Sequence, residues 1–191
     1  MNILLIQGHP DGAASHLCHT LADSYGRAAT EAGHDVRSLD VAKISFPLLR
    51  TKQDFEHGDV PADIAAAQQS IAWAQHLVLV YPLWLGEMPA LVKAFLEQVM
   101  RPGFAFEVGD HGWKPRLRGK TARIVITMGM PAAAYRWYFG AHSLKSLRRN
   151  ILSFAGVKPV RATLIGMVEA ASDRRRARWL AELAKLGATA R

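Results

Sequence analysis

The chain has 191 residues, of which 50% are hydrophobic and 21% charged, and 24 Lys and Arg face 16 Asp and Glu for a net charge of +8. This length predicts a single domain spanning residues 1–191 with a full hydrophobic core, and the composition argues against disorder. The lone Cys18 excludes an intrachain disulfide framework and favours a reducing, cytoplasmic location, while the basic balance suits an anionic partner without identifying one.

Five short apolar runs predict buried strands. They are Asn2–Gln7, Asp35–Asp40, Leu77–Tyr81, Ala122–Met128 and Val160–Gly166. The runs are nearly continuous in Ile, Leu and Val, which is typical of strands covered on both faces in a parallel sheet. The longest apolar stretch, residues 77–85, is far shorter than the roughly 20 residues of a spanning helix, so we expect no membrane insertion.

A helical pattern follows each strand. These patterns cover about residues 17–32, 61–74, 88–99, 141–155 and 172–186. Gly33 suits the end of the first helix, Pro61 suits the first turn of the second, and Ser172 suits the N-cap of the last. Alternating strands and helices predict a doubly wound α/β fold, with five parallel strands and helices on both faces.

Ligands of doubly wound folds bind beyond the carboxyl ends of the strands, where the strand order reverses. The first such loop, His9–Leu17, has neither a Gly-x-Gly-x-x-Gly fingerprint nor a Walker A lysine. It is nevertheless rich in small residues and leads into a helix N-terminus, where free N–H groups favour a phosphate. His9, Ser15 and His16 would add side-chain donors. The alternative is an ordinary turn in which Ser15 caps the helix.

The loops after the third and fourth strands carry aromatic residues. Trp84, between Pro82 and Glu87, either stacks on a planar ring or packs against Phe104 and Phe106. Four aromatic residues follow the fourth strand: Tyr135, Trp137, Tyr138 and Phe139. They either wall a ligand pocket or form an oligomer contact, since aromatic residues are enriched in both.

Several segments together resemble one family. They are Gly8-His9-Pro10 with Ser15, the run 81–86, Pro89–Lys93, Gly103–Phe106, the strand 120–129 and Phe154-Ala155-Gly156. In combination they are similar to the flavodoxin-like NAD(P)H:quinone oxidoreductases, which include diaphorases, modulators of drug activity and ancillary subunits of potassium-efflux systems. The resemblance covers residues 2 to about 166 and implies a flavodoxin-like sheet of order 2-1-3-4-5.

The resemblance also implies a flavin site. Residues that would hold the flavin phosphate are His9, Ser15, His16 and Leu17. Residues that would line the isoalloxazine ring are Pro82, Leu83, Trp84 and Leu85, with Thr127, Met128 and Gly129 at its pyrimidine end. Tyr135 and His142 would match a catalytic tyrosine and histidine that manage charge and protons beside the flavin.

The implied activity is two-electron, ping-pong hydride transfer from NAD(P)H through the flavin to a quinone or similar acceptor. FMN is the first choice of cofactor and FAD the alternative, while the choice between NADH and NADPH stays open. The family implies a homodimer with sites at the subunit interface. The alternative function is a flavin-binding regulatory or ancillary subunit of a membrane transport system.

Two other partner classes are not expected. The basic clusters Arg174–Arg176 with Arg178, and Lys145 with Arg148 and Arg149, lie on predicted helices and fit solvated faces. No nucleic-acid-binding motif accompanies them, so we expect no nucleic acid partner. His16 and His19 lie three residues apart, but no further ligands complete a metal site.

Overall fold

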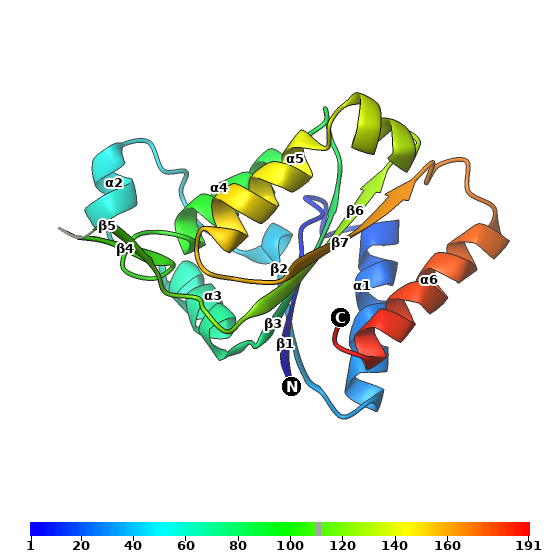
Figure 1. Ribbon diagram of the computed structural model, residues 1–191, viewed down its shortest axis with the longest axis horizontal. Coiled ribbons are helices and arrows are strands. Elements are labelled where there is room, and N and C mark those ends of the chain that lie inside the picture. Colours follow the sequence, from blue (N-terminus) through cyan, green and yellow to red (C-terminus); the bar gives the residue numbers. More distant parts are fainter. Residues whose placement is uncertain (110–111) are drawn as a thin grey trace.

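The structure is a computed structural model that describes residues 1–109 and 112–191. At its centre lies a parallel sheet with the strand order β2-β1-β3-β6-β7 (Figure 1). The strands are β1 (Asn2–Gln7), β2 (Asp35–Asp40), β3 (His76–Pro82), β6 (Thr121–Met128) and β7 (Val160–Gly166). Counted along this sheet the order is 2-1-3-4-5, which confirms the flavodoxin-like topology expected from the sequence.

Burial follows the position of each strand in the sheet. All seven residues of β3 and all but the first of β6 are buried, whereas most residues of the edge strands β2 and β7 are partly or fully exposed. Within β1, Leu4 and Ile6 face one hydrophobic cluster while Ile3 and Leu5 face the other. The central strands are therefore apolar on both faces, which explains their continuous apolar runs.

Helices cover both faces of the sheet (Figure 1). They are α1 (Leu17–Glu31), α2 (Lys52–His57), α3 (Ala62–Trp73), α4 (Ala90–Val99), α5 (His142–Lys145) and α6 (Asp173–Ala188), with the short 3-10 helix η1 (Val41–Lys43) and the wide-turned π-helices η2 (Ala134–Tyr138) and η3 (Ser146–Ser153). Ile64 of α3, Phe95 of α4 and Leu147 of η3 share one core cluster. Leu21 of α1 and Leu183 of α6 belong to the other.

The structure differs from the sequence-based expectation in several places, including the helix α2, which was not predicted. The helix expected over 141–155 divides into α5 and η3. The helix expected from Met88 begins at Ala90, because Pro89 occupies the N-cap. A small antiparallel hairpin, β4 (Phe106–Gly109) and β5 (Gly112–Pro115), was not predicted, since its strands have only four residues each.

No helix within residues 1–109 and 112–191 combines the length and the apolar character that crossing a membrane requires.

Candidate functional site

The loops after β1 and β3 meet at the carboxyl edge of the sheet, and Gly8 brings them together. The Gly8 N–H donates to the carbonyl of Val80 at 2.8 Å. A Cβ added at Gly8 would lie 2.9 Å from Cγ2 of Val92 and 3.1 Å from Cβ of Tyr81. Only glycine therefore lets the first loop lie this close to the end of β3.

Three imidazoles gather where the first loop enters α1. The rings of His9 and His16 stack with centroids 3.8 Å apart, and the ring of His19 lies 5.6 Å from that of His9. Trp84, from the loop after β3, meets His9 edge-on at 6.1 Å. His9 is buried and Trp84 half exposed, so the cluster joins the two loops and still presents a flat aromatic surface.

The histidine cluster already holds one carboxylate. Nε2 of His16 lies 2.8 Å from Oδ2 of Asp11, and the Ala13 N–H donates to Oδ1 of the same side chain at 2.9 Å. The hydrogen bond from His16 keeps the pKa of Asp11 below its usual value. Burial, and secondarily the neighbouring His16, lower the pKa of His9. A loop that supplies imidazole and backbone donors to a carboxylate has the donor chemistry that a phosphate needs.

The start of α1 adds to this anion-binding character. Ser15 is exposed, and Leu17 is the first residue of a 15-residue helix that has no acidic side chain in its first turn. The positive end of the helix dipole therefore faces the histidine cluster without a nearby helix carboxylate to neutralise it. The residues present fit a phosphate group.

The loop after β3 is a tight turn. The N–H groups of Trp84 and Glu87 each donate to the other residue's carbonyl, at 2.9 and 3.0 Å. Leu85 has a φ of 50° and is fully exposed, and Gly86 follows with a φ of 80°. Within the described residues, neither the Leu85 nor the Gly86 N–H donates to a protein acceptor. These two N–H groups are available to the polar edge of a planar ligand.

The end of β6 is linked to the loop after β3 and to α1. The Leu83 N–H donates to the carbonyl of Thr127 at 2.7 Å, and Oγ1 of Thr127 lies 3.2 Å from Sγ of Cys18 in α1. Burial raises the pKa of Cys18 to about 11, so its thiol stays protonated and serves packing. Met128 is buried and its carbonyl accepts from the Val168 N–H, whereas Gly129 is exposed.

Tyr135 and His142 lie in a separate segment of the same edge. Tyr135 is buried, and its hydroxyl oxygen accepts a hydrogen bond from the Leu144 N–H at 3.1 Å. Burial raises the pKa of this hydroxyl. His142 is exposed, with its ring against Gly140. No hydrogen bond between described residues links either side chain to the histidine cluster, and their catalytic roles stay predictions.

The structure also shows groups that the sequence analysis left out. His19 completes the imidazole cluster, with its Nδ1 accepting from the His16 N–H at 3.2 Å, and the His-x-x-His spacing was the available signal. The hydroxyls of Tyr81 and Ser143 are buried without a hydrogen-bond partner among the described residues. No pattern in the sequence predicts that pair, because it depends on how β3 packs against α5.

Of the two roles considered for Trp84, packing against Phe104 and Phe106 finds no support. Its aromatic contact among the described residues is His9, and Phe106 packs instead against Phe154 at 5.0 Å. Within the same residues, no group of three His, Cys, Asp or Glu side chains could hold a metal ion.

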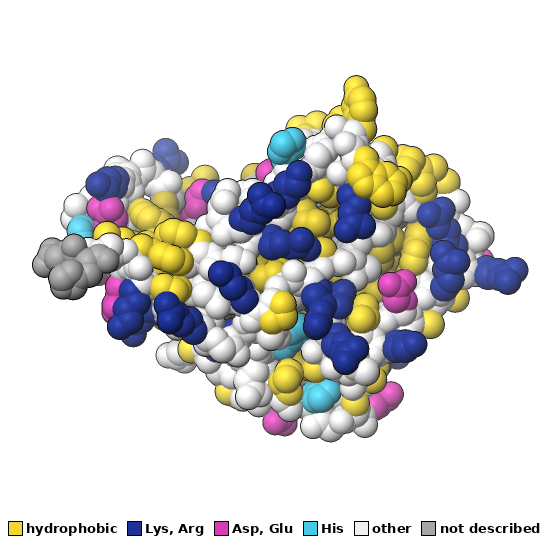
Figure 2. Space-filling model, in the orientation of Figure 1, with side chains coloured by type: hydrophobic (Ala, Val, Ile, Leu, Met, Phe, Trp, Pro, Cys, Tyr) yellow, Lys and Arg dark blue, Asp and Glu magenta, His cyan; other side chains and the backbone are white. Residues whose placement is uncertain are grey.

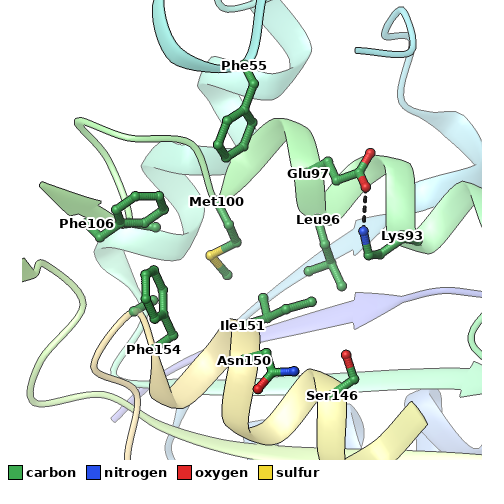
Figure 3. Close-up of a pocket in the computed structure, with 12 residues that line it drawn as sticks. Phe55, Lys93, Leu96, Glu97, Met100, Phe106, Ser146, Asn150, Ile151 and Phe154 are labelled. Carbon is green, nitrogen blue, oxygen red and sulfur yellow. Dashed lines mark hydrogen bonds and ion pairs between the residues drawn. The ribbon is translucent and has the colours of Figure 1, made fainter. Parts of the chain in front are cut away.

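A cavity of about 340 Å³ lies between α4 and η3, away from these loops (Figure 3). Its mostly apolar lining comes from α2, α4, the hairpin region and η3, and includes Phe55, Leu96, Met100, Phe106, Ile151 and Phe154. None of the residues predicted to hold the flavin lines it.

Residues 1–186 match the family model described as the flavodoxin-like fold. The chain belongs to this family. It is 29% identical to a Haemophilus influenzae protein described as an uncharacterized NAD(P)H oxidoreductase, over 92% of this chain and 89% of that protein. It is 27% identical to an FMN-dependent NADH:quinone oxidoreductase of Nitratidesulfovibrio vulgaris, over 85% of each chain. The solved structure of Smu.1420 from Streptococcus mutans superposes with a TM-score of 0.84 and 25% identity, covering 99% of this chain and all of the other.

Proposed function

We propose that this member of the flavodoxin-like family is an FMN-dependent NAD(P)H:quinone oxidoreductase. The observation that carries the proposal is the meeting of His9, His16 and Trp84, from two loops, at the carboxyl edge of β1 and β3. This edge is where the strand order reverses: β2 lies on one side of β1, and the chain then returns to β3 on the other side of β1 and continues outward to β6. The names of the Haemophilus and Nitratidesulfovibrio relatives support the same activity.

The phosphate end of the cofactor would lie at the start of α1. His9, His16 and Ser15 would donate to it, together with the backbone at Leu17, and it would replace the Asp11 carboxylate at His16. FMN is preferred over FAD because the chain offers little beyond this loop to hold an adenosine, and because a relative is named for FMN.

The ring of the cofactor would lie over the turn after β3. Residues proposed to contact it are Pro82, Leu83, Trp84, Leu85, Thr127, Met128 and Gly129. When bound, a flavin accepts hydride from a nicotinamide and returns it to a second substrate at the same face. The free N–H groups of Leu85 and Gly86 would orient its polar edge. Tyr135, whose raised pKa keeps its hydroxyl protonated, and the exposed His142 would hold protons nearby.

We also propose that the protein is a cytoplasmic homodimer of single-domain subunits. The apolar cavity between α4 and η3 is partly open to the surface and has several aromatic side chains in its lining (Figure 3). It supports a dimer, since aromatic residues are enriched at subunit contacts. The hairpin beside it exposes Val108 and Trp113, which would extend the contact. The buried, unreactive Cys18 agrees with a reducing compartment.

The visible absorption spectrum of the purified protein, with FMN and FAD added separately, tests the proposal first. We expect flavin bands that NADH or NADPH bleaches without air and that a quinone restores. The Trp84→Ala variant should bind FMN at least about tenfold more weakly, because the ring loses its flat neighbour. Trp73→Ala is the matched control, since Trp73 is also partly exposed but ends α3, before the amino end of β3.

Each outcome of this experiment is informative. A protein that binds neither flavin would overturn the proposal. A protein that binds flavin and accepts hydride but passes none to quinones would favour the regulatory, ancillary role.

A further inference from the structure

The charge of this chain is unevenly distributed. Residues 1–131 contain twelve Lys and Arg against thirteen Asp and Glu, a net charge of −1. Residues 132–191 contain twelve Lys and Arg against three Asp and Glu, a net charge of +9. The whole basic excess of the protein therefore lies in its last 60 residues, and such asymmetry indicates a surface for an anionic partner.

These 60 residues build one side of the molecule. η3 lies on one face of the sheet, α6 on the other, and β7 forms the edge strand between them (Figure 1). Exposed basic side chains come from these three elements, from the end of α5 and from the turn before β7: Lys145, Arg149, Lys158, Arg161, Arg174, Arg178 and Lys185. We call this set the basic face. Figure 2 shows it as dark blue side chains with few acidic ones between them.

The charges of the basic face are not neutralised by the protein. All five ion pairs among the described residues involve positions before 117. The three acidic residues of the segment, Glu169, Asp173 and Glu182, form none of them. A cluster of unpaired cations repels itself, and an external anion relieves this repulsion.

Exposed aromatic side chains adjoin the basic face. Trp137, Tyr138 and Phe139 are 78%, 85% and 50% exposed. They lie in and directly after η2 at the carboxyl end of β6, and Arg136 precedes them. Figure 2 shows hydrophobic side chains gathered over this segment, beside the basic side chains. We call these three residues the aromatic ridge.

We propose that the basic face and the aromatic ridge together bind the surface of an anionic lipid bilayer. Tryptophan and tyrosine favour the headgroup region of membranes, and Lys and Arg bind anionic headgroups there. A nucleic acid duplex would use the cations, but its bases stay stacked within the helix and give no reason for three consecutive exposed aromatic residues. The lipid surface accounts for both features.

This surface gives the proposed activity a substrate source. The aromatic ridge follows the same strand, β6, whose end carries Thr127 and Gly129, so a molecule docked through the ridge holds this part of the carboxyl edge next to the bilayer. Quinones with long apolar tails reside in bilayers. This part of the inference rests on the proposed function, whereas the binding of lipid does not.

Flotation of the full chain with vesicles tests the binding directly. We expect binding to vesicles of phosphatidylglycerol and phosphatidylcholine but not to phosphatidylcholine alone, and weaker binding as salt rises. Lys145→Glu with Arg149→Glu should lower partitioning by about 25-fold or more, since each basic residue near an anionic surface contributes roughly fivefold. Trp137→Ser with Tyr138→Ser should weaken the binding that remains at high salt.

The control is Arg27→Glu with Arg50→Glu, which changes the net charge equally. Both residues are exposed, Arg27 beside the opposite edge strand β2 and Arg50 before α2. This variant should change partitioning by less than about twofold. Equal losses in both charge variants, or no preference for anionic vesicles, would overturn the proposal. The proposal would also be overturned if duplex DNA displaced vesicles equally well from the wild type and from the Trp137→Ser, Tyr138→Ser variant.

A quinone assay separates this inference from the proposed function. Lys145→Glu with Arg149→Glu should slow reduction of a long-tailed quinone held in anionic vesicles, with reduction of a water-soluble quinone unchanged. If the protein binds vesicles but reduces neither quinone, the proposed lipid-binding surface would be supported and the proposed oxidoreductase activity would be overturned.

Discussion

Two regions of the carboxyl edge differ in how firmly they are built. The loops after β1 and β3 touch through His9 and Trp84, and hydrogen bonds anchor each loop to a neighbouring strand, Gly8 to Val80 of β3 and Leu83 to Thr127 of β6. The segment 129–145 after β6 turns through Gly140 and Ala141, both with positive φ, and between two π-helices. In the loops after β1 and β3, two paired central strands hold the side chains in place. In the segment 129–145, the side chains are held by the end of one strand and by a strained turn.

The two regions are therefore suited to different functions. A rigid pair of loops suits binding, because the donors keep their positions without the ligand. A segment with left-handed residues and exposed aromatic side chains suits adjustment to varied substrates or surfaces. Variants of each region can break or sharpen the distinction.

The largest effect is expected from Gly8→Val. The added side chain collides with Val92 and Tyr81 and separates the two loops, so we expect a loss of about 2–3 kcal/mol of unfolding free energy and no measurable FMN binding. Chemical denaturation and flavin titration measure both. Gly26→Ala in α1 is the control, because its Cβ finds no neighbour closer than 3.6 Å and should stabilise the helix slightly. Normal FMN binding by Gly8→Val would show that the loops need not touch.

The binding of FMN should strengthen as the pH falls from about 8 to 6. The pKa of His9 is lowered in the free protein, and a phosphate dianion beside it would raise it, so binding takes up protons. One proton gives up to about tenfold in affinity per pH unit, until the phosphate itself is protonated near pH 6.

The folding stability of the ligand-free protein should change with pH in the opposite direction to the affinity for FMN. Because burial holds the folded-state pKa of His9 below the usual histidine value of about 6.5, the unfolded chain binds the proton first, and stability falls as the pH drops below that value. His9→Asn should flatten the pH profile of FMN binding and His142→Asn should not. The stability profile should keep a slope in both variants, because burial lowers the pKa of His76 to about 4 and this residue also loses stability as the pH falls. A steep profile of FMN binding retained in His9→Asn would remove His9 from the phosphate site.

Tyr135→Phe and His142→Asn separate structure from chemistry in the second region. Tyr135→Phe leaves the Leu144 N–H without an acceptor in the core, which should cost about 1–2 kcal/mol of unfolding free energy. His142→Asn should change stability by less than about 0.5 kcal/mol, because the residue is exposed, while slowing quinone reduction about tenfold. Stopped-flow reduction and thermal unfolding measure the two effects. Unchanged rates in both variants would exclude them from catalysis.

The smallest effect is expected from Leu85→Gly. Leu85 has a left-handed φ of 50° and a fully exposed side chain, so glycine should relieve about 1 kcal/mol of strain. The affinity for FMN should nevertheless fall, because the side chain no longer packs on the ring. Leu85→Asn is the control, since asparagine tolerates this φ. Unchanged affinity in Leu85→Gly would show that only the backbone of the turn contributes.

The sequence predicted the parts of the fold that depend on local pattern. Three of the five strands have the expected bounds, and β3 and β6 extend beyond theirs by one or two residues. Their apolar runs are continuous because both faces of each central strand are covered. The hairpin β4–β5 was missed because Trp113 is held by Phe154, which is distant in sequence.

The candidate site was predictable to the extent that it follows strand ends. His9, Trp84 and Thr127 lie together because β1, β3 and β6 are neighbours in register. The orientation of Tyr135 was not predictable. Its ring lies in the core while its neighbours 137–139 are exposed, and this depends on the wide turn of η2 and on the Leu144 N–H.

The packing of α6 on α1 also sets an order of events during synthesis. Ser24 donates to the carbonyl of Leu180, and a Cβ at Gly187 would lie 2.2 Å from the carbonyl oxygen of Tyr25, so the two helices are in direct backbone contact. α1 carries the histidine cluster at its start, yet α6, the element that completes its burial, follows every strand of the sheet in the chain. A nascent chain that ends before α6 should therefore hold the histidine cluster too loosely to bind a phosphate, even when the whole sheet has been synthesised.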